Sequence, residues 1–376
     1  MGEHEDMTDA STSESDPRPV TLGTHAANVV RAVPPDCFAA VMATGIVSIS
    51  FHSILPVLSV VLFWIAAVSY AVLIVASAAR IAMFGGLMRG ELADPAHGFG
   101  HFTFVAGTDV IGSRLALAGH PAPAAVLLLV GAVGWVVLGY LVPWSALFGD
   151  ARRPALAQAC GSWFVWAVAS QSVAVLAGSL EPMVGTGRVQ LALLAVVAWS
   201  VGVVCYAAVG VVVAVRLLRY RPEPAEINPP YWVAMGATAI TVLAGSEIVH
   251  MSYAPMLTAT RGLVADGSVV FWAFGTWLIP PLVIAGWWRH VTHRVSLRYD
   301  AGWWSIVFPL GMYGAACAGL ATADHLPIVG AIGRVDDWVA LVAWAVVSAA
   351  MLAHLPRVWA RRKSPARPAT AGLRSP

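Results

Sequence analysis

Residues 122–142 read APAAVLLLVGAVGWVVLGYLV, an uninterrupted apolar stretch without a charged residue. About 20 apolar residues in a helix are long enough to cross the roughly 30 Å hydrocarbon core of a bilayer. The stretch begins after Pro121 and ends before Pro143, and proline is disfavoured in the interior of a helix. This segment therefore predicts a transmembrane helix bounded by prolines.

Nine further segments share this character and predict the same element. The chain of 376 residues is 59% hydrophobic and only 11% charged, a composition that excludes an ordinary soluble globular protein. We therefore predict an all-α membrane protein with ten transmembrane helices. The predicted spans are 35–55, 57–84, 101–119, 122–142, 156–178, 188–216, 229–253, 267–288, 301–321 and 336–356.

Basic residues alternate between the loops on the two sides of these spans. Eighteen of the 22 Lys and Arg fall in the two tails and in the loops after spans 2, 4, 6 and 8. The opposite loops hold only Arg188, Arg261 and Arg334, and Arg114 lies inside a span. Because cytoplasmic loops carry the excess of basic residues, both termini are predicted to be cytoplasmic, in a multi-pass protein of the plasma membrane.

The ends of the chain differ in composition from the predicted membrane domain at 31–356. Residues 1–30 start with an acidic, Ser- and Thr-rich tail, and residues 357–376 are rich in Arg, Pro and Ala. Such compositions are typical of disorder, so we predict two disordered cytoplasmic tails. The four cysteines form no CxxC pair, and no soluble basic run is interleaved with aromatics. We therefore expect no metal, no cofactor and no nucleic-acid partner.

The spans form pairs, because the loops within pairs are short and the basic loops lie between pairs. The chain therefore predicts five hairpins in series around a central axis. Small and hydroxyl residues concentrate in the odd-numbered spans, whereas the even-numbered spans are mostly aliphatic. Polar groups at membrane depth favour the bundle interior, so we predict inner odd helices, outer even helices and a narrow central pore. The residues that we predict to line this pore or to kink its helices are Thr44, Gly45, Gly107, Thr108, Ser170, Gln171, Gly236, Thr238, Pro309 and Gly311.

Four ionisable residues lie at or near membrane depth. Asp109 and Arg114 are in the third span, and Glu247 and His250 are in the seventh. Asp109 and Arg114 are five residues apart, about 140° around an ideal helix, whereas Glu247 and His250 share a face. A carboxylate on an anion path would repel its substrate. We therefore expect buried ion pairs, above all between Asp109 and Arg114, or alternatively neutral carboxyls or carboxyls that carry a proton with the anion.

The string from Trp303 to Pro309, WWSIVFP, resembles a motif of the tellurite-resistance/dicarboxylate transporter family, which includes the slow anion channels and the malic acid transport proteins. The ten-span hairpin layout supports the resemblance, as do three further stretches. These are residues 38–45, Trp163-Phe164 with Gln171, and residues 231–236. The resemblance covers about 35–355. It implies an anion pore through five inner helices, a homotrimer, and a phenylalanine of the ninth span, here Phe308, as the pore gate.

Pro309 agrees with this assignment, because a proline kink turns the preceding side chain and a ring in a narrow pore resists water and ions. A ring of Arg80, Arg152, Arg153, Arg219, Arg289 and Arg294 is predicted to concentrate anions at the cytoplasmic mouth.

The predicted function is transport of small inorganic anions or of C4-dicarboxylates such as malate. A proton-coupled dicarboxylate carrier is the first alternative. A more distant one is a haem- or quinone-binding membrane subunit, although no pair of histidines lies at matched depth in mid-membrane. With no nucleotide-binding loop in the sequence, we expect neither an enzyme nor an ATP-driven pump.

Overall fold

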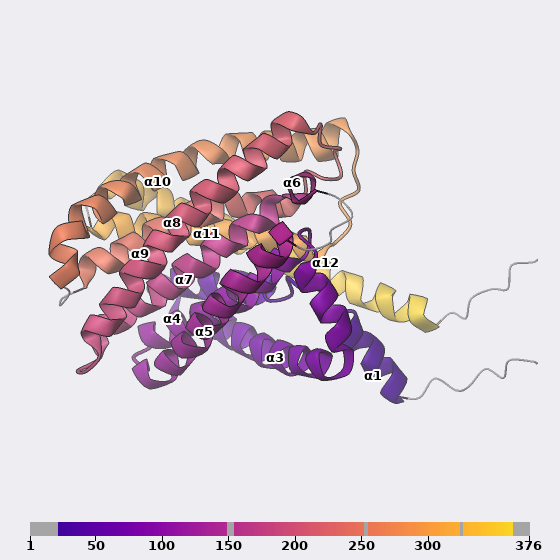
Figure 1. Cartoon of the computed structure of the whole chain (residues 1–376), viewed down its shortest axis with the longest axis horizontal. Coiled ribbons are helices and arrows are strands. Elements are labelled where there is room, and N and C mark those ends of the chain that lie inside the picture. The colour runs from indigo at the N-terminus through magenta and orange to yellow at the C-terminus, as the bar shows by residue number, and fades with distance from the viewer. Residues whose placement is uncertain (1–21, 149–153, 252–254, 324–325, 364–376) are drawn as a thin grey trace, which may run out of the picture.

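The computed structural model describes residues 22–148, 154–251, 255–323 and 326–363, and the regular elements in these ranges are all helices (Figure 1). The long helices are α3 (Pro56–Ala93), α5 (Pro121–Phe148), α8 (Arg188–Arg219), α10 (Pro255–Trp287) and α12 (Pro327–Lys363). Between them lie α2 (Ala39–Ser50), α4 (Phe102–Leu117), α7 (Val165–Leu180), α9 (Val233–His250) and α11 (Trp304–Ala323). The short elements are α1 (Leu22–Arg31), α6 (Ala155–Gln158), η1 (Gly98–His101), η2 (Gly161–Phe164), η3 (Glu181–Met183), η4 (Pro229–Trp232), η5 (Trp288–Thr292) and η6 (Ala301–Trp303).

Eight helical spans of the described residues are long and apolar enough to cross a membrane. They correspond to α3, α5, α7, α8, α9, α10, α11 and α12, and the spans of α7, α9 and α11 include the 3-10 turns that adjoin these helices (Gly161–Met183, Pro229–His250 and Ala301–Ala323). The helix α2 is apolar but shorter, and α4 is a 16-residue helix that carries Asp109 and Arg114. The protein is therefore an all-helical, multi-pass membrane protein.

Burial separates the helices into two sets. The apolar windows of α7, α9 and α11 are mostly buried, and α2 and α4 are buried along most of their length. In the windows of α3, α5, α8, α10 and α12 at most a third of the residues are buried. We call the first five the inner helices and the second five the outer helices.

The inner helices pack on one another in a closed cycle. The helix α2 contacts α4, α4 contacts α7, α7 contacts α9, α9 contacts α11, and α11 contacts α2 again. Each inner helix also packs against the outer helix that follows it in the chain. Figure 1 shows the long helices lying beside one another in one bundle, with α1 and the end of α12 together at one end.

Small residues bring the inner helices close together. A Cβ atom added at Gly45 would overlap Val110 of α4, and one added at Gly236 would overlap Pro309 of α11. Glycine therefore allows backbones to approach more closely than other residues would.

Two predicted tails contain helix. Leu22–Arg31 form α1, within the segment 1–30 that we expected to be disordered, and α12 continues to Lys363, beyond the start of the predicted tail at 357. In α12 the helix passes through Pro356, the last residue of the predicted tenth span. In α5 the helix passes through Pro143 and continues to Phe148, so Pro143 does not end the fourth span as predicted. The rest of both tails lies outside the described residues.

Candidate functional site

The inner helices all begin at the same end of the bundle, around one cavity. The helices α4, α7, α9 and α11 each follow a 3-10 turn (η1, η2, η4 and η6), and α2 follows a turn at 35–38. A cavity of about 470 Å³, which we call the vestibule, is lined by a residue from the start of each. These residues are Asp36 before α2, His97 before α4, Ser162 before α7, Asn228 before α9 and Asp300 before α11.

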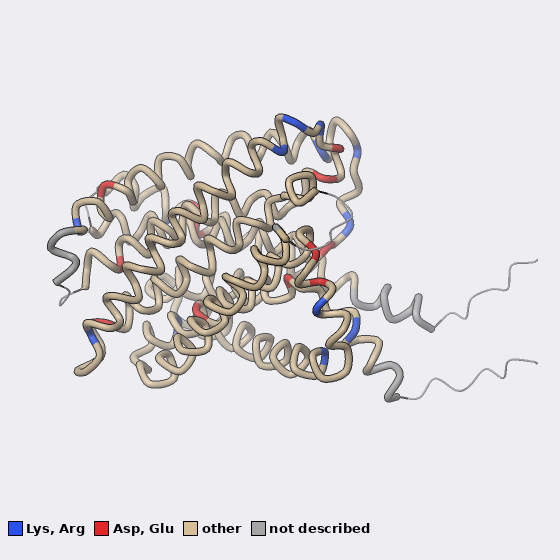
Figure 2. The backbone as a smooth tube through the Cα atoms, viewed as in Figure 1, with Lys and Arg blue, Asp and Glu red and all other residues tan. Residues whose placement is uncertain are grey.

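Charged groups of both signs line the vestibule, and several of them already have partners. Asp300 accepts a hydrogen bond from the amide of Gly302 at 2.7 Å and so caps η6. Arg289 donates to the carbonyl oxygens of Pro224, Ala225 and Ile227. Arg298 is exposed on the wall. Figure 2 shows that most Lys and Arg of the described residues gather at this end of the bundle.

Tyr299 adds a neutral polar group to the same wall. Burial raises the pKa of its phenol above the ordinary value, so the hydroxyl stays protonated at neutral pH. Its oxygen accepts a hydrogen bond from Nε1 of Trp304, the first residue of α11, at 3.1 Å. The loop before α11 is thereby fixed to the start of the helix.

Phe308 is fully enclosed, with 1% of its surface exposed. Viewed along the helix axis, Pro309 lies about 100° from Phe308 in one direction, and Gly311 lies about 60° from Phe308 in the other direction. Pro309 packs against Gly236 of α9, and Gly311 packs against Ile46 of α2. Phe308 therefore lies between the two faces through which α11 contacts its inner neighbours.

The opposite face of α11 contacts outer helices. Cys317 lies about 180° around the helix from Phe308. It accepts a hydrogen bond from Nε1 of Trp272 of α10 at 3.3 Å and packs against Gly333 of α12. Phe308 is thus on the side of α11 that is turned away from the outer helices.

The hydroxyl residues that we predicted to line the pore make hydrogen bonds toward outer helices. Thr44 of α2 accepts a hydrogen bond from Nε1 of Trp344 of α12 at 3.0 Å. The hydroxyls of Thr108 of α4 and Tyr70 of α3 lie 2.9 Å apart. These two threonines connect the inner ring to the outer helices.

The same orientation recurs in α7 and α9. Ser170 accepts a hydrogen bond from Nε1 of Trp135 of α5 at 2.8 Å, and Gln171 donates to the carbonyl oxygen of Trp199 of α8 at 3.1 Å. Thr238 of α9 packs against the backbone at Gly275 of α10. These partners in the outer helices were not predicted from the sequence. The sequence feature that could have identified them is a Trp or Tyr, with its hydrogen-bond donor, near the middle of an aliphatic span.

Asp109 and Arg114 do not form the expected ion pair. Asp109 is fully buried, and Oδ2 accepts a hydrogen bond from Ser172 of α7 at 2.7 Å, while Oδ1 packs against Gly131 of α5. Oδ1 has no hydrogen-bond partner among the described residues. The two side chains leave α4 in directions about 140° apart, so each reaches a different neighbour.

Arg114 is a buried cation held by neutral groups. Nε donates to the hydroxyl of Ser48 of α2 at 3.0 Å, and Nη2 donates to Ser59 of α3 at 3.1 Å. The guanidinium also lies 5.4 Å from the ring centroid of Phe63. Only 3% of the residue is exposed. No carboxylate of the described residues forms a salt bridge with it.

Glu247 and His250 are also not joined by a salt bridge in the described residues. His250 is exposed, and its Nδ1 donates to the carbonyl oxygen of Ser246 at 2.7 Å. Glu247 is half-buried and lies beside Ser179 of α7. The shared face that the sequence predicted does not bring the two groups into an ion pair.

The predicted ring of arginines is divided among several roles. Arg80 is buried and forms a salt bridge with Glu91 at 2.7 Å, and Arg289 is bound to the backbone carbonyls named above. Arg219 ends α8, and Arg294 lies in an exposed, irregular segment with a left-handed φ of 52°. Arg152 and Arg153 lie outside the described residues.

Comparison with known proteins places this architecture in a family. A sequence model of the voltage-dependent anion channel family matches residues 32–352. The chain belongs to this family. The match covers the inner and outer helices together, so it confirms the resemblance drawn from the WWSIVFP string and the hairpin layout.

Individual relatives agree with a membrane transporter. The chain is 24% identical over 327 residues to an "Uncharacterized transporter", MJ0576, of Methanocaldococcus jannaschii, covering 85% of this chain and 92% of that protein. It is 63% identical over 150 residues to an "Uncharacterized membrane protein", Rv1735c, of Mycobacterium tuberculosis, covering 40% of this chain and 76% of that protein. The family and these names point to a channel or transporter rather than to an enzyme, and the family indicates anions as the transported species.

Proposed function

We propose that this protein conducts anions through a path enclosed by the five inner helices, with Phe308 as its gate. The observation that carries the proposal is the closed cycle of α2, α4, α7, α9 and α11, whose N-terminal ends surround one vestibule. A ring of five helices with their starts at one mouth is an arrangement through which a small solute can pass.

The vestibule favours anions because of the direction of the helices. Each helix N-terminus carries a partial positive charge of roughly half an elementary charge, concentrated in its first turn. Five such ends around one cavity attract a negative ion even though Asp36 and Asp300 also line the wall. The exposed Arg298 contributes further positive potential.

Arg114 supplies positive potential deeper in the bundle. Its charge faces Ser48 and Ser59 rather than a carboxylate, so it is not neutralised locally. Inside a protein, a fixed charge acts over a longer range than it does in water. An anion between the inner helices is therefore stabilised near α2 and α4.

Phe308 forms the constriction in this proposal. It is enclosed and is turned away from the outer helices, and Pro309 interrupts the hydrogen bonding of α11 beside it. An aromatic ring across a narrow path excludes water and hydrated ions until it moves. The hydroxyl-bearing residues that face the outer helices leave the path lined mainly by apolar side chains and glycine.

The proposed topology has ten spans in five hairpins, because α2 and α4 alternate with the outer helices as the longer inner helices do. The vestibule then lies on the cytoplasmic side of the plasma membrane, where the basic residues gather. From the family resemblance we also propose that the protein is a homotrimer. Its proposed substrates are small inorganic anions or C4-dicarboxylates.

A proton-coupled carrier is the second candidate, and Asp109 favours it. Ser172 lies within hydrogen-bonding distance of both Asp109 and the carbonyl oxygen of Ala169, but its hydroxyl has one proton to donate. A protonated Asp109 could donate to Ser172, which would then donate to Ala169. Loading and unloading that proton would couple proton movement to the passage of a dicarboxylate.

Flux measurements in proteoliposomes separate the two candidates. The wild-type protein is reconstituted, and chloride, nitrate and malate movement is measured with and without a proton gradient. A channel gives currents that reverse at the anion equilibrium potential and that do not require a proton gradient. A carrier gives malate uptake that is driven by the proton gradient and is abolished in Asp109→Asn. Because the Phe308 ring can hold the wild-type path closed, the same fluxes are measured for Phe308→Ala. Absence of both signals from the wild type and from Phe308→Ala, each folded in the liposomes, would refute anion transport.

A further inference from the structure

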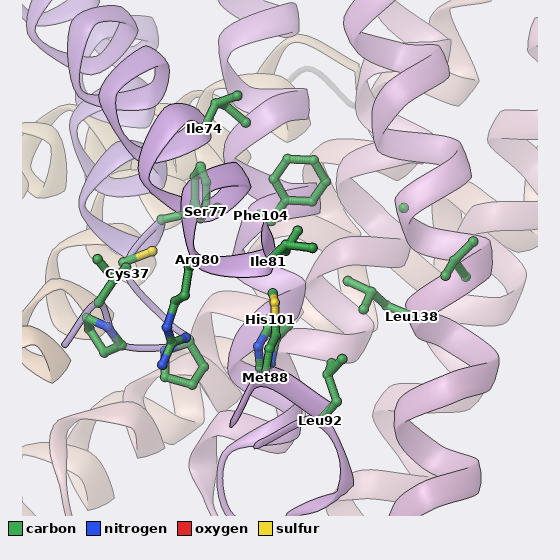
Figure 3. Close-up of a pocket in the computed structure, with 16 residues that line it drawn as sticks. Cys37, Ile74, Ser77, Arg80, Ile81, Met88, Leu92, His101, Phe104 and Leu138 are labelled. Carbon is green, nitrogen blue, oxygen red and sulfur yellow. The ribbon is translucent and has the colours of Figure 1, made fainter. Parts of the chain in front are cut away.

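A second cavity, of about 230 Å³, lies on the outer side of the inner ring, between α3 and α5 (Figure 3). The helix α3 is kinked at Phe84, where φ is −134° and ψ is 34°. Residues on both sides of this kink line the cavity, among them Ile74 before it and Met88 after it. The kink therefore curves α3 around the cavity, and α5 closes the opposite wall with Leu138.

The cavity opens toward the lipid-facing surface. Ile81 of α3 and Val137 of α5 line it, and 56% and 54% of their surfaces are exposed. Most of the remaining wall is apolar, including Phe104 and Leu92. A molecule with a hydrocarbon chain can therefore enter from the bilayer without crossing water.

Two buried side chains interrupt the apolar wall, and Figure 3 shows them toward the same end of the cavity. Arg80 and His101 are 4% and 7% exposed. Nη2 of Arg80 donates to Glu91 at 2.7 Å, but its Nε has no hydrogen-bond partner among the described residues. Nε2 of His101 also lacks a partner there.

The hydrogen bonding of His101 fixes which kind of partner its free nitrogen requires. Nδ1 lies 3.1 Å from the carbonyl oxygen of Gly98, and a carbonyl only accepts, so Nδ1 carries a proton. In the neutral ring Nε2 then accepts a hydrogen bond. Nε of Arg80 always donates. Arg80 and His101 both line the cavity, so its wall contains one unfilled donor and one unfilled acceptor. Each nitrogen is covered by neighbouring atoms and is costly to leave unpaired, and a ligand in the cavity reaches the two nitrogens through a rotation of these side chains.

We propose that this cavity binds a long-chain fatty acid, with its carboxyl group at Arg80 and His101 and its chain between α3 and α5. The carbonyl oxygen of the acid accepts from Nε of Arg80, and the acid proton is shared between the second oxygen and Nε2 of His101. The chain packs on Ile74, Phe104 and Leu138. A carboxyl group has two separate oxygens for these two nitrogens.

Other lipids fit the two nitrogens less well. An ester or a phosphodiester has acceptors but no proton for Nε2 of His101. Glu91 already balances the charge of Arg80, which disfavours a head group with a permanent charge. The apolar chain and the combined donor and acceptor at its end therefore select a fatty acid.

The site also contacts the inner ring. Phe38, at the start of α2, lines the cavity and packs edge-on against Phe104 of α4, with ring centroids 5.4 Å apart. Phe38 lies on the other side against Gly107 of α4. A molecule bound in the cavity therefore contacts α4 and the start of α2, two of the five inner helices. This contact does not depend on which anion the protein transports.

Photo-cross-linking tests the site directly. The full chain is placed in phosphatidylcholine nanodiscs with a hexadecanoic acid that carries a diazirine in its chain, and labelled peptides are mapped by mass spectrometry. We expect saturable labelling of α3 and α5 that unlabelled hexadecanoic acid displaces. Its methyl ester and hexadecanol should compete about tenfold more weakly, because one hydrogen bond is lost or shared.

Two variants and a matched control complete the test. Ser77→Phe fills the cavity and should remove most of the labelling, whereas Val75→Phe adds the same ring on the exposed face of α3 and should leave it unchanged. His101→Phe removes the acceptor and should abolish the preference for the acid over the ester. Thermal unfolding in the nanodiscs confirms that each variant is folded. Labelling spread over all the outer helices, labelling unchanged in Ser77→Phe, or equal competition by acid and ester would overturn the proposal.

Discussion

At the scale of single residues, hydroxyl groups in this protein connect helices instead of solvating a path. Thr44 is the clearest case, because its oxygen accepts from Trp344 of α12 while its own proton goes to Ala40 in the preceding turn. Both hydrogen-bonding roles of this hydroxyl are thereby filled, and the side chain has little to offer a passing anion.

Thr44→Val is therefore expected to reduce stability and to leave anion selectivity unchanged. The loss should be about 0.6 kcal/mol and at most about 2 kcal/mol, because hydrogen bonds between membrane helices contribute little each. Thermal unfolding and permeability ratios measure the two effects. A changed chloride-to-nitrate ratio with unchanged stability would place Thr44 in the path instead.

Arg114 has the opposite character, because its charge is not matched by a carboxylate. At an effective dielectric constant of about 20, a unit charge roughly 15 Å from an anion changes its energy by about 1 kcal/mol, or about fivefold in occupancy. Arg114→Met should lower anion conductance by a factor of that order, and Arg114→Lys should restore most of it. Equal currents in Arg114→Met and wild type would show that this charge does not act on the path.

At the scale of helices, the contacts between inner helices depend on glycine. A Cβ atom at Gly236 would lie 2.8 Å from Cγ of Pro309, whereas nothing lies within 4 Å of one at Gly210 in the outer helix α8. Gly236→Ala should therefore destabilise the protein by about 1–3 kcal/mol, the usual range for overpacking. Gly210→Ala should be neutral or should stabilise by up to about 1 kcal/mol, since alanine favours helix. If both variants unfold at the wild-type temperature, α9 and α11 are not as closely packed as described.

The helices could be predicted from the sequence, but the directions of their side chains could not. Apolar length alone predicts a span, so α5 and α8 were evident from composition. The helix α7 is buried on nearly every side, and a helix without an exposed face gives no pattern that separates the axis from the outer helices. Ser170 and Gln171 were therefore predicted to line the pore, although their hydrogen bonds lead to α5 and α8. The ion pair between Asp109 and Arg114 failed for a related reason, because nearby serines on α7, α2 and α3 provided closer partners.

At the scale of the whole molecule, the vestibule lies on the cytoplasmic side in the proposed topology. Thr186 lies in an exposed loop between α7 and α8, and Ser296 lies in an exposed loop of the vestibule wall. In a variant without native cysteines, Thr186→Cys should react with a membrane-impermeant maleimide in intact cells. Ser296→Cys should react only after the cells are opened. The reverse pattern would invert the proposed topology.

The most direct measurement is the anion current of Phe308→Ala in liposomes, beside that of Phe51→Ala. Both phenylalanines are almost fully buried, but Phe51 packs against Trp338 of the outer helix α12, with ring centroids 5.1 Å apart. Both variants lose a similar apolar contact, so both should be destabilised to a similar degree. Phe308→Ala alone should raise the current several-fold, with reversal at the anion equilibrium potential. If both variants conduct like the wild type while remaining folded, Phe308 does not gate an anion path through the inner helices.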